Sequence, residues 1–127
     1  MNSASDFNST LNNHLNAIKN RDITNYLATV ADTAVVIMLN GTKIEGKAAI
    51  QALHADWFAD TDWSIDFKIE NAFETTDSAL ACLAVSYTDK DSSGKTLTFC
   101  YWLSLLFHKN VNTSKWELVF DQNTNIK

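Results

Sequence analysis

Residues Thr96–Phe107 read TLTFCYWLSLLF, and Trp116–Asn123 read WELVFDQN. β-branched and aromatic residues crowd both segments, and turn-forming polar residues separate them, which predicts two strands joined by a hairpin. The first strand is apolar at both alternating positions, so both of its faces need to be covered. The second ends in the polar run Asp121–Asn123. A carboxylate at the end of an otherwise buried strand is costly unless it is paired, solvated or chemically used, so Asp121 is the first functional lead.

The segments before this pair predict three helices and a short hairpin. Apolar residues recur with helical spacing between residues 7 and 18, and Asp22 can cap a second, shorter helix. An apolar strand at 34–39 ends at Asn40-Gly41, a dipeptide that favours a tight hairpin, and a return strand follows at 42–45. Residues 47–59 predict a third helix with His54 and Trp57 on its apolar face.

From Trp63 onward the hydrophobic period changes to two, which predicts a long half-exposed strand to Glu74. A second strand, with mostly small side chains, is predicted at 79–88. With the closing pair these strands form a four-stranded antiparallel meander. Helices first and strands last predict an α+β domain with the helices on one face of the sheet, and residues 1–127 are expected to form a single domain. A strongly twisted sheet of such long strands curls around the helices and makes a cone with a cavity.

Composition and charge exclude several classes of function. The chain has 127 residues, of which 46% are hydrophobic and 20% charged, as in soluble globular proteins. A net charge of -5 with scattered Lys and Arg argues against nucleic-acid and membrane partners. No apolar run approaches the roughly 20 residues of a membrane span. The N-terminal residues lack a signal peptide's features, so we expect a cytoplasmic location, although a mature form cut from a precursor would look the same.

The two cysteines, Cys82 and Cys100, lie in predicted strands and are expected to fall near each other across a hairpin. We expect them to be reduced and buried, with a disulfide as the alternative in an oxidising compartment. No cluster of Cys and His has the spacing of a zinc site, so no metal and no cofactor are predicted.

The order and spacing of these elements resemble the nuclear-transport-factor-2-like superfamily, in its SnoaL-like and kinase-association-domain-like branch. The residues that carry the resemblance are EGKAAI at Glu45–Ile50 and the pattern W-x-x-V-x-D-Q-N-T at Trp116–Thr124. The resemblance covers essentially the whole chain. It implies a cone-shaped curved antiparallel sheet wrapped around the N-terminal helices, a cystatin-like roll, and a homodimer formed through the outer sheet face.

The resemblance also implies a function. Enzymes of the superfamily, among them isomerases, cyclases and dehydratases, use an Asp or His inside the cone for acid–base chemistry without a cofactor. The candidate catalytic residues here are Asp121 and His54. A carboxylate among aromatic side chains has a raised pKa, which suits proton transfer near neutrality. The alternatives are a structural Asp that caps a turn or pairs with a cation, and a core His bonded to a backbone carbonyl.

A pocket for a small apolar or aromatic ligand is expected inside the cone, because aromatic walls bind such molecules and exclude water. Its expected wall and binding residues are Trp57, Trp63, Tyr87, Trp102 and Asn123. Plain core packing explains each aromatic residue equally well. A complete ketosteroid-isomerase site needs further oxyanion donors, for which Tyr87, Tyr101 and Tyr26 are available. Superfamily members also include non-catalytic binding and assembly modules, so whether this chain is an enzyme stays open.

Overall fold

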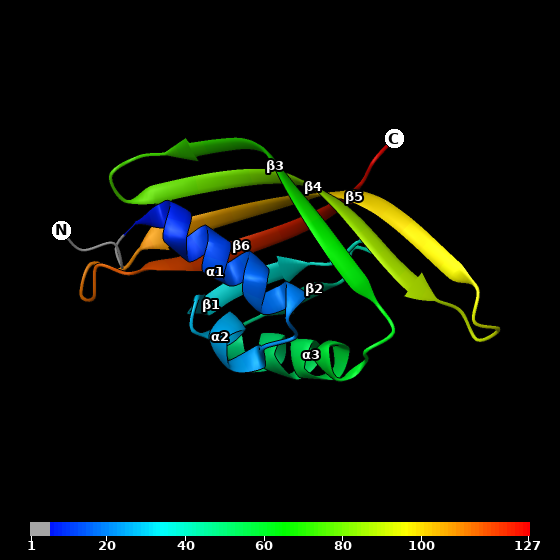
Figure 1. Ribbon diagram of the computed structural model, residues 1–127. Coiled ribbons are helices and arrows are strands. Elements are labelled where there is room, and N and C mark those ends of the chain that lie inside the picture. The colour runs from blue at the N-terminus through cyan, green and yellow to red at the C-terminus, as the bar shows by residue number, and fades with distance from the viewer. Residues whose placement is uncertain (1–5) are drawn as a thin grey trace.

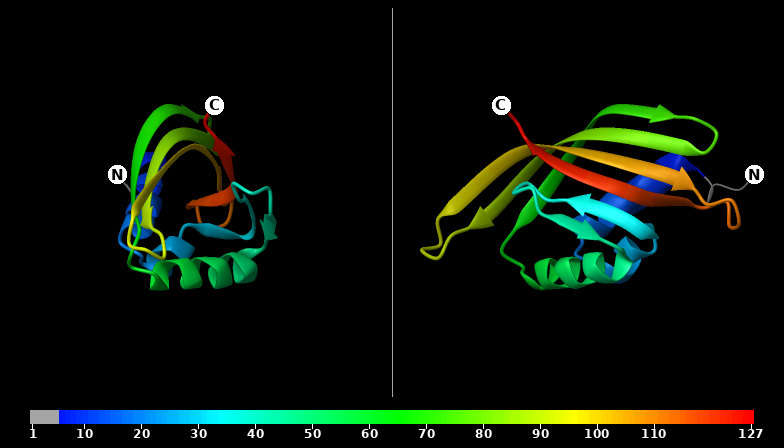
Figure 2. Two further views of the ribbon diagram at one scale, coloured as in Figure 1. Left: turned by 90° about the vertical axis from the view of Figure 1, so that its right-hand side faces the viewer. Right: turned by 180° about the vertical axis from the view of Figure 1, so that it is seen from behind.

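The computed structural model describes residues 6–127 and has the expected α+β architecture, with helices collected on the concave side of one curved sheet (Figure 1). The elements are, in chain order, α1 (Phe7–Lys19), α2 (Ile23–Leu27), β1 (Val30–Ile37), β2 (Lys43–Glu45), α3 (Lys47–Ala59), β3 (Ser64–Glu74), β4 (Ser78–Lys90), β5 (Thr96–Lys109) and β6 (Trp116–Asn125). Seen along the strands, the sheet curls over the helices (Figure 2).

The sheet has the strand order β2-β1-β6-β5-β4-β3. Strands β3 to β6 form the predicted antiparallel meander. The pairing of β1 with β6 is parallel, with Val36 opposite Asp121, so the sheet is not antiparallel throughout. Turn residues predict hairpins between neighbouring segments, but they carry no information about pairing between strands at opposite ends of the chain. As a result the last strand lies inside the sheet rather than at its edge.

Carboxylates begin both N-terminal helices. Asp6 accepts a hydrogen bond from the backbone N–H of Asn8 at the start of α1, and Asp22 accepts one from the N–H of Asn25 at the start of α2. The apolar face of α1 lies against the sheet, where Phe7 packs edge-on to Phe107 at a ring-centroid distance of 5.4 Å. No helix within residues 6–127 is long and apolar enough to cross a membrane.

The two cysteines do not lie next to each other, contrary to expectation. Cys82 pairs with Ser104 and Cys100 pairs with Ser86, so the cysteines are four residues out of register. At about 3.4 Å per residue this separates them by roughly 14 Å, which is too far for a disulfide. Both thiols are free; Cys82 is half-buried, and Cys100 is exposed rather than buried. Both point away from the helices, because the neighbouring positions Leu83 and Tyr101 are buried on the inner face.

Candidate functional site

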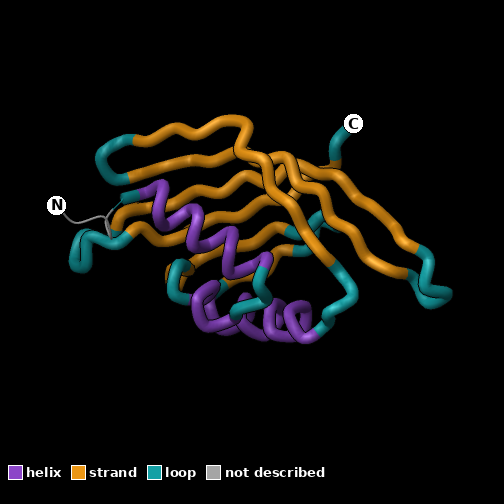
Figure 3. The backbone as a smooth tube through the Cα atoms, viewed as in Figure 1, coloured by secondary structure: helices purple, strands orange, loops and turns teal. Residues whose placement is uncertain are grey.

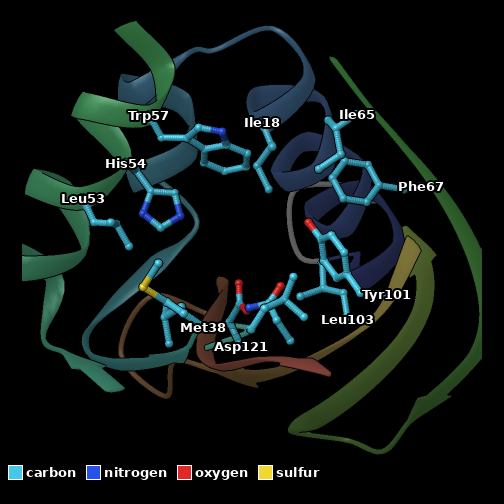
Figure 4. A pocket seen from close by; sticks show the side chains of 13 residues that line it. Ile18, Met38, Leu53, His54, Trp57, Ile65, Phe67, Tyr101, Leu103 and Asp121 are labelled. Atoms are coloured by element: carbon cyan, nitrogen blue, oxygen red, sulfur yellow. The ribbon is translucent and has the colours of Figure 1, made fainter. Parts of the chain in front are cut away.

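A pocket of about 360 Å³ opens inside the cone (Figure 4), between α3, the end of β1 and the inner faces of β3, β5 and β6, whose backbone arrangement is drawn in Figure 3. Aliphatic and aromatic side chains form most of its lining, and its polar groups come from His54, Tyr101, Asp121 and Asn123. No Lys or Arg lines it. The expected cavity is therefore present, at the lower end of the size range of ligand pockets.

Asp121 faces this pocket because of the alternation along β6. It pairs with the buried Leu105 of β5, whereas Gln122 pairs with Ser104 on the outer face. Asp121 is only 6% exposed. Burial raises the pKa of its carboxyl to about 7, and a hydrogen bond from Asn123 opposes that rise. The group therefore exchanges its proton near neutral pH.

Asn123 holds Asp121 in place. Its Nδ2 donates to Oδ1 of Asp121 at 3.0 Å and to the backbone oxygen of Ile37 at 2.8 Å. A backbone carbonyl can only accept, so the nitrogen of the amide must be the atom on that side, and both of its hydrogens are used. The amide oxygen of Asn123 is left as an acceptor in the pocket lining. Because Ile37 belongs to β1, the parallel β1–β6 contact is part of the site.

His54 reaches the pocket from α3 (Figure 4). Its Nδ1 lies 2.8 Å from the backbone oxygen of Ile50. That oxygen only accepts, so Nδ1 carries the proton and Nε2 is a bare acceptor. Burial lowers the pKa of the imidazole, which keeps the ring neutral. Among residues 6–127 no hydrogen bond joins His54 to Asp121, so His54 does not orient Asp121 by direct contact.

A second histidine is buried behind the first. His14 of α1 is completely enclosed, and burial lowers the pKa of its imidazole to about 3. Its Nδ1 lies 2.8 Å from the hydroxyl of Thr29, which donates to the backbone oxygen of Tyr26. The Tyr26 ring lies between the histidines and stacks on His54 at a centroid distance of 4.3 Å. This stack fixes the plane of the His54 ring.

Of the aromatic residues predicted to line the pocket, only Trp57 does so. Trp63 is stacked behind it at a centroid distance of 4.4 Å, and Trp57 Nε1 donates to the Tyr87 hydroxyl at 3.1 Å. Trp63 and Tyr87 therefore support Trp57 and do not line the cavity themselves.

Trp102 does not belong to the site, and its expected place in the pocket is wrong. Side chains alternate along β5, and Tyr101 and Leu103 both point into the pocket. Trp102 therefore lies on the outer face, 37% exposed, opposite Ala84 and Thr124. Tyr101, which the sequence offers only as a further oxyanion donor, takes the inner position. Burial and the nearby Asp121 carboxylate raise the pKa of its phenol, so the hydroxyl stays protonated.

Several lining residues are not singled out by the sequence, among them Met38, Leu53 and Phe67. The available signal was the period of each element, because Leu53 lies four residues before Trp57 on α3 and Phe67 follows Ile65 at the strand period of two. Within the described part of the chain, no three His, Cys, Asp or Glu side chains gather closely enough to hold a metal ion.

Several solved structures share this architecture. A ketosteroid isomerase-like protein from Erwinia carotovora atroseptica superposes with a TM-score of 0.82 at 18% identity, over 98% of this chain and 97% of that chain. A candidate dehydratase of the NTF2-like family from Streptomyces avermitilis gives a TM-score of 0.78 at 14% identity, over 94% of each chain. A protein with a cystatin-like fold from Caulobacter vibrioides gives 0.81 at 14% identity, over 99% of this chain and 92% of that chain. At such identities the likeness establishes the fold alone.

A search of the curated proteins found no match. The family model of the SnoaL-like domain matches residues 11–109, which is most of the chain. The expected SnoaL-like resemblance is thereby confirmed, and the solved structures share the expected fold. The protein belongs to the SnoaL-like domain family.

Proposed function

We propose that the protein binds a small, mainly apolar carbonyl compound inside the cone and moves a proton on it, without a cofactor, by means of Asp121. The observation that carries this proposal is a carboxyl group, buried in a largely apolar pocket, whose pKa is raised to about 7. A carboxyl group of this kind is populated both as acid and as base at neutral pH, which favours proton transfer in either direction.

The pocket offers one group that can remove the proton and another that can stabilise the carbonyl oxygen. Asn123 binds one carboxyl oxygen of Asp121, so the other oxygen is free to take a proton from a carbon beside the carbonyl group. The protonated Tyr101 hydroxyl points into the same space (Figure 4) and would donate to the carbonyl oxygen as it gains negative charge. Returning the proton to another carbon is an isomerisation, and losing a neighbouring hydroxyl as water is a dehydration.

Two observations support this class of reaction. Similar structures include a ketosteroid isomerase-like protein and a candidate dehydratase. The pocket is also lined by no Lys or Arg, so it lacks the cationic groups that would favour an acidic substrate. His54 serves as a neutral acceptor beside the ligand rather than as the base, because burial lowers its pKa and its proton is used on Ile50.

The test compares wild type with Asp121→Asn on a panel of cyclic ketones. Asn keeps the size and hydrogen bonding of the side chain but has no titrating group, so we expect ligand-induced thermal shifts to persist and turnover to fall by about 100-fold or more. Asp56→Asn is the matched control, because Asp56 is exposed on α3. Unchanged turnover in Asp121→Asn would refute the assignment.

We further propose that the protein forms a homodimer through the outer face of its sheet. Four large apolar residues stand in register across β3, β4, β5 and β6, namely Phe73, Leu80, Leu106 and Phe120. Phe73 is 62% exposed in the single chain. Phe73, Leu80 and Leu106 are exposed and Phe120 is half-buried, and an apolar row of this kind marks an interaction surface. If the pocket proves to be inactive, assembly through this row is the second candidate function.

A cytoplasmic location is also part of the proposal. Cell fractionation followed by immunoblotting of the tagged protein tests this location.

A further inference from the structure

We propose that the ligand of the pocket is a neutral compound that carries a hydroxyl group in addition to its carbonyl group. This inference rests on the proposed function, because it concerns the same pocket and names the chemical class of its substrate. It follows from asking which polar atoms of the pocket still lack a partner once the protein's own hydrogen bonds are assigned.

Two of these atoms are acceptors. The proton of His54 lies on Nδ1 and is used on the backbone oxygen of Ile50, so Nε2 offers a lone pair. Both amide hydrogens of Asn123 are used on Ile37 and Asp121, so its Oδ1 also offers lone pairs. Neither acceptor bonds to another residue within residues 6–127, and both residues line the pocket. An acceptor removed from water without a donor is costly, so a matching ligand supplies one.

A carbonyl group cannot supply that donor. It pairs with the hydroxyl of Tyr101 and leaves the acceptors of His54 and Asn123 without partners. A purely apolar ligand leaves all three groups unpaired. A hydroxyl group donates one hydrogen, so a ligand with one hydroxyl and one carbonyl pairs with the Tyr101 hydroxyl and with one of the two acceptors, which we assign to His54 Nε2.

Charge narrows the class further. An anionic ligand would meet the carboxylate of Asp121 and two acceptors, with no Lys or Arg in the lining to neutralise it. An ammonium group would pair with Asp121, but it would leave water for a lining dominated by side chains such as Met38 and Leu103. It would also hold Asp121 ionised and so remove it from proton exchange. A neutral ligand avoids both costs.

The test uses a matched set of indane compounds that differ only in their polar groups: 1-indanone, 1-indanol, 3-hydroxy-1-indanone, indane-1-carboxylate and 1-aminoindane. Binding to the wild-type chain is measured by calorimetry at pH 7. We expect 3-hydroxy-1-indanone to bind at least tenfold more tightly than 1-indanone or 1-indanol. The carboxylate and the amine should bind most weakly.

Two variants assign the groups. His54→Phe removes the imidazole acceptor and should reduce the advantage of the hydroxyketone over the ketone. Tyr101→Phe removes the phenol donor and should instead reduce the advantage of the hydroxyketone over the alcohol. Loss of both advantages in both variants would indicate general damage to the pocket, which thermal denaturation of the free proteins detects independently.

The outcomes separate this inference from the proposed function. If 1-indanone binds as tightly as the hydroxyketone, or the carboxylate or amine binds best, or no member binds, the proposed ligand class is wrong. The role of Asp121 would then be tested only by the turnover of Asp121→Asn.

Discussion

Two buried side chains of this protein have pKa values that are shifted in opposite directions. Burial raises the pKa of Asp121 to about 7, so the folded chain keeps a proton there that the unfolded chain loses above about 3.8. Burial lowers the pKa of His14 to about 3, so the folded chain lacks a proton that the unfolded chain binds below about 6.5. Both shifts disfavour the charged form, and they have opposite effects on the pH dependence of stability.

Between about pH 4 and 6.5 the two effects oppose each other. Asp121 makes the free energy of unfolding fall as the pH rises, because only the folded chain holds its proton. His14 makes it rise with pH, because only the unfolded chain holds that proton, and the lowered pKa of His54 acts in the same direction. We therefore expect the slope for Asp121→Asn to exceed the wild-type slope by about 1.4 kcal/mol per pH unit.

Urea denaturation at pH 4.5, 5.5 and 6.5 measures this difference in slope. The exposed substitution Asp56→Asn serves as the control and should follow the wild-type curve. Parallel curves for wild type and Asp121→Asn would mean that Asp121 does not keep its proton in the folded state.

For single residues, the sequence predicts which ones belong to the site better than it predicts where their side chains point. Asp121 stands out because a carboxylate interrupts an apolar strand, and His54 and Trp57 stand out on the apolar face of a helix. Tyr101 and Trp102 are adjacent in a strand that is apolar on both faces, so the pattern cannot tell which points inward. Only the pairing with neighbouring strands decides that the tyrosine lines the pocket.

One arginine joins two loops that are far apart in the sequence. Arg21, at φ 55° between α1 and α2, donates to the backbone oxygens of Asp60, Thr61 and Trp63. Its guanidinium also lies 4.2 Å from the centroid of the Trp63 ring, which stacks on the pocket residue Trp57. The corner between α1 and α2 thereby fixes the end of α3 and one wall of the pocket.

We expect Arg21→Lys to loosen this wall, because an ammonium group cannot reproduce the planar, multiply bonded guanidinium. The free energy of unfolding should fall by about 1 to 3 kcal/mol, with weaker ligand binding. Chemical denaturation and calorimetric titration measure the two effects. Lys19→Ala is the control, since its ion pair with Asp66 is exposed and contributes little. Equal effects of both substitutions would argue against a specific role for the guanidinium.

Helices and strands are predicted well at the element scale, because their hydrophobic periods are local properties of the chain. The parallel contact of β1 with β6 is not, since it joins Val36 to Asp121 and no local pattern specifies it. The same contact supplies the Ile37 oxygen that orients Asn123. Part of the site therefore depends on a pairing that periodicity alone does not reveal.

For the whole molecule, the apolar row on the outer sheet face predicts the oligomeric state. We expect wild type to be a dimer and Leu106→Asp to be a monomer, because a dimer would bury the introduced carboxylate without a partner. Analytical ultracentrifugation measures both. Val111→Asp is the matched control, since Val111 is 86% exposed in the β5–β6 turn, outside the row. A monomeric wild type, or a dimeric Leu106→Asp, would contradict the proposed interface.

The central place of β6 in the sheet has a consequence for biosynthesis. A ribosome makes β1 long before β6, yet β1 has no neighbour on its inner side until β6 arrives. Nascent chains therefore expose two unpaired strand edges, on β1 and β5, until translation has passed Asn125. Premature termination before β6 would leave a chain with an open sheet and without Asp121 in its cavity, and we expect chaperones and proteases to recognise such a chain.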